Sequence, residues 1–142
     1  MMKGSWHFII GTVVFTILWL LIDEIKFTMI FIPIALSLFP DADLKLNSHR
    51  NFLFHSVILW VVVFIFNPSL MMALVCLSIG IHCISDITLI PSAWKGFYTL
   101  KLVGNRPFFM FIKGCRGLLT TLWLLVNFII SVIVVVIALW VW

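Results

Sequence analysis

The stretch PSLMMALVCLSIGIHCISDITLI, residues 68–90, decides the fold class. Nearly every residue in it is apolar, and at about 1.5 Å per residue a helix of this length crosses the roughly 30 Å hydrocarbon core of a bilayer. Its most polar side chains, His82 and Asp86, are spaced one helical turn apart near its C-terminal end. The stretch predicts a membrane-spanning helix with a polar pair close to one membrane face.

The composition of the whole chain agrees with a membrane protein. Of its 142 residues, 64% are hydrophobic and 10% are charged, and the mean hydropathy is +1.27. Soluble domains are typically about 45–50% apolar and about 25% charged. This composition excludes a soluble globular domain, a disordered tail and a nucleic-acid-binding module, and the length favours a single domain over residues 1–142.

Four more apolar runs, separated by short polar breaks, complete the pattern. We expect an all-α, polytopic bundle of about five transmembrane helices, over residues 6–22, 25–39, 52–66, 68–90 and 118–142. The first three runs are short, so polar flanking turns or a locally thinned bilayer must supply the missing length. Pro33 is expected to kink the second run, and the segment 107–112 is expected to be interfacial or re-entrant.

Basic residues predict the orientation of this bundle. With five spans, the N-terminus and the loops 40–51 and 91–117 share one side, which carries eight of the nine lysines and arginines. Only Lys26 lies on the other side. Because cytoplasmic loops are enriched in basic residues, we expect a cytoplasmic (inner) membrane protein with a cytoplasmic N-terminus. The basic excess then reflects topology and contact with anionic membrane lipid, and requires no nucleic acid.

Most of the side chains that can bind a metal fall at this cytoplasmic face. The predicted helices bring together there all four histidines and three of the five carboxylates, namely His7, Asp41, Asp43, His49, His55, His82 and Asp86. Ionisable groups at membrane depth are costly and usually face a partner or a cavity. The other two carboxylates are expected to form a solvated turn on the opposite side.

The pair His82 and Asp86 is the most informative of these. An i, i+4 spacing stacks both side chains on one face of a helix. They can chelate one metal ion, or one can orient the other as a metal ligand. An ordinary hydrogen bond between the two at a helix end explains the pair equally well.

The loop between the second and third predicted helices carries two short motifs. Asp41 and Asp43 follow a proline, and in an extended chain their carboxylates point the same way and repel unless a cation lies between them. Taken alone, a solvated turn is the simpler explanation. His49 and His55 flank the start of the third helix, with His55 expected in its first turn. Arg50 can bind a phosphate through its guanidinium group. It is equally explained as one of the basic residues that set the orientation of the protein in the membrane.

Together the seven groups form a stronger pattern than any one of them. Mixed histidine and carboxylate ligands suit Zn, Mn or Fe better than Mg or Ca. We expect one or two divalent metal ions, with Zn or Mn preferred. A bound metal ion lowers the pKa of its water and stabilises the transition state of phosphoryl transfer.

The order of these motifs resembles a known family. The motifs are PDAD at residues 40–43, His-Arg at 49–50, His-Ser at 55–56, GIH at 80–82 with a following aspartate, and an early histidine. They are similar to those of the membrane-bound metal-dependent hydrolases, a LexA-regulated inner-membrane group. The resemblance covers residues 5–90 and departs from the family pattern at Asn51 and Phe54, where the family has glycine and threonine. It implies a helical membrane fold and metal-dependent hydrolysis.

We therefore expect an integral-membrane hydrolase that cleaves a phosphoester, either lipid-linked or free, at the headgroup level. Arg50 is expected to hold the phosphate, and a residue among Asp41, Asp43 and His49 that does not bind metal is expected to be the general base. Two alternatives remain open. One is a non-catalytic scaffold or regulator, in which a structural metal or a polar network ties the helices together. The other is a metal-ion carrier, which should place its ligands nearer the bilayer midplane.

Overall fold

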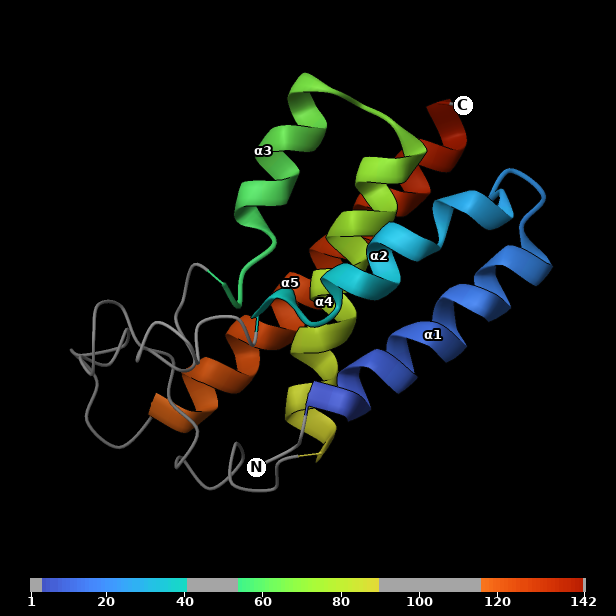
Figure 1. Cartoon of the computed structure of the whole chain (residues 1–142). Coiled ribbons are helices and arrows are strands. Elements are labelled where there is room, and N and C mark those ends of the chain that lie inside the picture. Colours follow the sequence, from blue (N-terminus) through green and yellow to red (C-terminus); the bar gives the residue numbers. More distant parts are fainter. Residues whose placement is uncertain (1–3, 41–53, 90–115, 142) are drawn as a thin grey trace.

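The structure, a computed structural model, describes residues 4–40, 54–89 and 116–141. Within these segments every regular element is a helix, as the sequence predicts (Figure 1). The elements are α1 (Gly4–Leu21), the 3-10 helix η1 (Phe27–Met29), α2 (Phe31–Leu36), α3 (Ile58–Phe66), α4 (Leu70–Leu89) and α5 (Arg116–Val141).

Helix α4 is the central element of the bundle. It begins after Ser69, whose Oγ accepts the backbone N–H of Met72 at 3.3 Å and so caps the helix. Helices α1, α2, α3 and α5 all pack against it, and 83% of its segment Leu70–Ile87 is buried. A helix that is apolar on every side can be buried on every side. The stretch that decides the fold class is therefore the core of the molecule.

Helices α4 and α5 run antiparallel and pack most extensively (Figure 1). The two helices lie close together at Gly80, where an added Cβ would lie 2.7 Å from the Cβ of Ser131 and 3.3 Å from the Cα of Phe128. Small residues at a helix interface allow such an approach of two backbones. The buried face of α5 recurs every three or four residues, at Thr120, Leu124, Asn127, Ser131, Val134 and Ala138.

Three of the five predicted helices are confirmed with ends within two residues of the expected positions. These are α1, α4 and α5. Helix α1 ends just before Asp23 and Glu24, because carboxylates at a helix C-terminus interact unfavourably with the helix dipole. The chain then turns, and the backbone N–H of Ile25 bonds to the carbonyl of Ile22 at 3.0 Å.

The second predicted helix, over residues 25–39, is wrong as a single span. The segment forms η1 and the six-residue α2, and α2 packs on α4 (Figure 1). Pro33 is the physical reason, because it has no N–H to bond to the carbonyl of Met29 and its ring would clash with that carbonyl in a continuous helix. The expected kink is therefore a full break.

The third predicted helix, over residues 52–66, is shorter than expected within the described residues. Helix α3 begins at Ile58, and His55 lies in the turn before it, not in its first helical turn. The N–H of Val57 bonds to the side-chain Oδ1 of Asn127 on α5 at 2.8 Å instead of to a helical carbonyl. The hydroxyl of Ser56 accepts the N–H of Ile58 at 3.2 Å.

Two helices are long and apolar enough to cross a membrane, over Leu70–Ile87 in α4 and Leu118–Val141 in α5. At about 1.5 Å per residue, the six residues of α2 and the nine of α3 give helices of only about 9 and 14 Å. Neither of these can cross a bilayer alone, so the expectation of five full-length spanning helices does not fit the described residues.

Candidate metal centre

Four of the predicted metal ligands meet at one end of the bundle. Helix α1 supplies His7, the turn before α3 supplies His55, and α4 supplies His82 and Asp86. All four are buried, with 5% or less of each residue exposed. Figure 1 shows why they can meet, since the start of α1 lies beside the end of α4. The structure therefore brings these four predicted ligands together.

The carboxylate of Asp86 is the centre of this cluster. The Nε2 atom of His7 lies 3.4 Å from its Oδ1, while the Nε2 atoms of His55 and His82 lie 3.7 and 3.8 Å from its Oδ2. A direct N–H···O hydrogen bond is about 2.7–3.2 Å long. The i, i+4 pair on α4 therefore shares a helix face as expected, but at a separation beyond that of an ordinary hydrogen bond.

The separations suit a metal ion better. Ligand atoms of His7, His82 and Asp86 all lie within 4.8 Å of one another. In a tetrahedral zinc site, metal–ligand bonds of about 2.0–2.1 Å place the ligand atoms about 3.3 Å apart. The His7–Asp86 distance of 3.4 Å matches this value, and His82 needs only a small movement to reach it. The ligand atoms of the three residues lie close enough together to hold one metal ion.

The hydrogen bond of His82 fixes which of its nitrogens can bind a metal. Its Nδ1 lies 2.8 Å from the main-chain carbonyl oxygen of Ser37, at the end of α2. A carbonyl only accepts, so Nδ1 carries the proton and donates it. In the uncharged ring, Nε2 then carries the lone pair, and it is Nε2 that faces Asp86. This is the arrangement typical of a metal-binding histidine, whose second nitrogen donates to a carbonyl or carboxylate.

The same reasoning applies to His7 through a serine relay. The hydroxyl of Ser85 donates to the carbonyl of His82 at 2.8 Å, so its oxygen can only accept from the Nδ1 of His7, which is 2.7 Å away. Nδ1 of His7 therefore also carries a proton, and its Nε2 presents a lone pair to Asp86. Two lone pairs and a carboxylate face one buried point, which favours a cation there, either a metal ion or a proton.

Stacking and a short helix hold the rings in place. The rings of His7 and His82 stack with centroids 3.9 Å apart, and the ring of His55 meets that of His82 edge-on at 5.3 Å. The hydroxyl of Ser78 donates to the carbonyl of Pro33 at 2.6 Å, which ties α2 to α4. This contact, together with the packing of α2 on α4, places the Ser37 carbonyl at His82.

The sequence did not indicate the residues that orient the histidines. Ser85 lies three residues after His82 and so near the same face of α4, but its hydrogen bond to His7 joins two helices and leaves no local pattern in the sequence. The carbonyl of Ser37 leaves no trace in the sequence, because every residue has one. Asn127 is also new, and a buried amide within an apolar helix is the signal that marks it.

The remaining predicted site residues lie outside the described residues. These are the two metal ligands Asp41 and Asp43, the histidine His49 and the phosphate-binding Arg50. The described cluster has ligands for one ion.

Comparison with known proteins gives no match to any family model, curated protein or solved structure. The family suggested by the motif order therefore stays a prediction, and function is argued from the chemistry of the site itself.

Proposed function

We propose that this chain is a membrane-embedded, metal-dependent hydrolase in which His7, His82 and Asp86 bind one divalent ion. One observation carries the proposal. Two histidines whose Nδ1 atoms are committed to hydrogen bonds direct their Nε2 atoms at one buried carboxylate. Imidazole and carboxylate ligands together suit Zn or Mn better than Mg or Ca.

The surface of the bundle supports its placement in a membrane. Outward-facing apolar side chains cover α1, α3 and α5, and 33% of the α5 segment Leu118–Val141 is buried against 83% for the segment in α4. Large contiguous apolar surfaces are rare on soluble monomers. Examples of the exposed apolar side chains are Leu20, Leu21, Ile65, Phe66, Val136 and Trp140. We place the protein in the cytoplasmic membrane with the cluster at the cytoplasmic face, from the distribution of basic residues.

In the proposed catalytic site, three of the described residues bind the metal and one position stays open. Catalytic zinc has three protein ligands and one open position, whereas structural zinc has four protein ligands. The described group comprises three residues, and His55 contacts Asp86 without joining that group. In this proposal His55 does not bind the metal but lies beside the open position, where its imidazole can exchange a proton with the substrate.

The proposed substrate is a phosphoester, and its polar end reaches the cluster from the membrane face. A bound metal ion would supply an activated water and positive charge for phosphoryl transfer. Asp86 and the two histidines would hold this ion, and the hydrogen bonds to Ser85 and to the Ser37 carbonyl orient the histidines. Arg50 as the phosphate-binding group, and Asp43 or His49 as general base, remain part of the proposal.

A structural site is the second candidate, and the burial of the cluster favours it. The side chains of His7, His55 and Asp86 are 2%, 0% and 7% exposed, so little of the site is open to solvent within the described residues. In that case all four residues would close around the ion and tie α1, α4 and the turn before α3 together. Such a site would stabilise the fold and release no product.

The test is phosphate release by purified protein in detergent, loaded with Zn or Mn. The substrates are an activated phosphodiester and phosphatidic acid in mixed micelles. The proposal expects turnover by the wild type, none by Asp86→Asn, and wild-type turnover by Asp23→Asn, which alters an exposed carboxylate in the turn after α1. Bound metal without turnover on either substrate would contradict the hydrolase and leave the structural site.

A further inference from the structure

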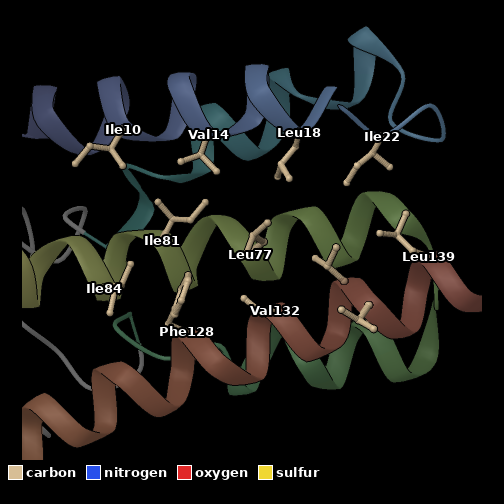
Figure 2. A pocket seen from close by; sticks show the side chains of 12 residues that line it. Ile10, Val14, Leu18, Ile22, Leu77, Ile81, Ile84, Phe128, Val132 and Leu139 are labelled. Carbon is tan, nitrogen blue, oxygen red and sulfur yellow. The ribbon is translucent and has the colours of Figure 1, made fainter. Parts of the chain in front are cut away.

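A groove along the outside of the bundle begins next to the metal cluster. It has a volume of about 450 Å³ and lies between α1, α4 and α5 (Figure 2). Every residue that lines it is apolar, and most are aliphatic; examples are Ile10, Val14, Leu77, Ile81 and Val132. A site of this size and composition suits a hydrocarbon ligand and offers nothing to a polar one.

One face of α1 connects this groove to the cluster. His7, Ile10, Val14, Leu18 and Ile22 follow one another at intervals of three or four residues, which places them on one helix face. The first of them belongs to the cluster and the other four line the groove. The groove therefore leads along α1 to the His–Asp cluster.

Helix α4 also links the groove to the cluster. Its Ser85 hydrogen-bonds His7 at 2.7 Å, and one turn further into the bundle Ile81 and Ile10 line the groove together (Figure 2). A helical turn is about 5.4 Å long. A molecule lying in the groove therefore places its end about one turn from the histidines.

The length of the groove selects the ligand. From Ile10 on α1 to Ile22, the residue just after the end of α1, it spans twelve residue steps, or about 18 Å at 1.5 Å each. The hydrocarbon of one bilayer leaflet is about 15 Å thick, half of the full core. One extended acyl chain therefore fits along the groove, with its headgroup at the end where the cluster lies.

We propose that this groove binds one acyl chain of a membrane lipid whose phosphorylated headgroup is the substrate of the His–Asp cluster. This inference rests on the proposed function and adds to it the substrate class, a lipid phosphoester, and the position of its chain. The ligand enters sideways from the bilayer, since several lining residues on α1 and α5 are partly exposed.

Photolabelling tests the proposal directly. The full chain is reconstituted in liposomes with phosphatidic acid that carries a diazirine on one acyl chain, and labelled peptides are mapped by mass spectrometry. A diacylglycerol with the same chain is the probe without a phosphate. We expect label on the groove residues of α1 and α5, and several-fold more from phosphatidic acid than from diacylglycerol. Equal labelling by the two probes would overturn the link between the groove and the cluster.

Adjacent residues on one helix provide matched variants. Val132 lines the groove, whereas Ile133 is 50% exposed and does not line it. Val132→Trp should lower the groove label several-fold, and Ile133→Trp should leave it unchanged. A second pair on α1, Leu18→Trp against Ile17→Trp, repeats the comparison if the first pair disturbs folding. Equal labelling within both pairs, or cross-links from the groove to a second copy of the chain, would overturn the proposal.

The same samples separate this inference from the hydrolase itself. If phosphate is released and the matched variants label alike, the groove assignment fails while the proposed function stands. If the groove label follows the variants but no metal binds and no phosphate is released, the proposed function fails and only a lipid-binding groove is left.

Discussion

The contact between His7 and Ser85 shows how a single hydroxyl can prepare a metal ligand. Ser85→Ala removes the acceptor of the His7 Nδ1 proton without altering any proposed ligand. Loss of such a partner typically weakens metal binding by about 10–100-fold. We expect a decrease of this size in zinc affinity, measured by competition with a chelator of known affinity.

Ser78 provides the matched control for this substitution. It lies on the same helix, is also buried, and also donates to a carbonyl, but that carbonyl belongs to Pro33 and not to the cluster. Ser78→Ala should cost about 1 kcal/mol of stability. It should lower zinc affinity much less than Ser85→Ala, because the packing of α2 on α4 still holds the Ser37 carbonyl at His82. Equal loss of affinity in both variants would show that the effect comes from a general loosening of α4.

His55 separates the catalytic site from the structural one. His55→Gln should retain the metal and lower turnover, because the proposal places this imidazole beside the metal and not on it. Metal content and phosphate release are measured on the same sample. Loss of the metal together with a large fall in melting temperature would instead identify His55 as a fourth ligand of a structural site.

At this scale the sequence indicated the residue types but not all of their partners. The i, i+4 spacing of His82 and Asp86 was enough to place both on one helix face, because helical geometry is local. His55 was placed one turn too far into a helix, since the amide of Asn127, 70 residues away, holds the N–H of Val57. Interactions between distant segments leave no local pattern in a sequence.

The contact between α4 and α5 depends on the absence of a side chain at Gly80. Gly80→Ala would gain up to about 1 kcal/mol of helix propensity, but its Cβ would overlap the side chain of Ser131. Overpacking of this kind typically costs about 1–3 kcal/mol. The overlap includes a Cβ, which cannot rotate away, so we expect a net loss of stability, measured as a lower melting temperature in detergent.

The reciprocal substitution tests whether the overlap is the cause. Ser131→Gly removes the side chain that the new methyl group would meet, although glycine itself weakens α5 by about 1 kcal/mol. The double variant should therefore be more stable than the sum of the two single effects predicts, with a coupling of about 1–2 kcal/mol. Simple additivity would mean that the destabilisation arises elsewhere.

Among the helices, the predictions from the long, uninterrupted apolar runs were confirmed. The long apolar runs that became α1, α4 and α5 were predicted to within two residues at each end. The run at 25–39 has the same composition, but Pro33 interrupts its hydrogen bonds. The helix that forms in this run, α2, is too short to span a membrane. The carbonyl of Ser37 at its end accepts the hydrogen bond from His82. Composition alone does not distinguish a spanning helix from one that supports a site.

At the scale of the molecule, the His–Asp cluster lies at one end of the described bundle, and the proposed function places that end at the cytoplasmic face of the membrane. Cysteines introduced singly into a variant without the native cysteines can report this orientation through a membrane-impermeant maleimide. We expect Glu24→Cys and Asn67→Cys to react in intact cells, and Lys45→Cys to react only after permeabilisation. The reverse pattern would place the cluster on the outer face.

The central claim is that the buried His–Asp cluster is a metal site, and its most direct test is the metal content of the purified chain. Mass spectrometry on protein exposed to Zn or Mn should find one ion bound by the described cluster in the wild type and in Asp23→Asn. That ion should be absent from Asp86→Asn and His82→Asn. If the wild type binds no ion, or if Asp86→Asn binds as much as the wild type, the metal site is contradicted and the cluster is a hydrogen-bonded tie between helices.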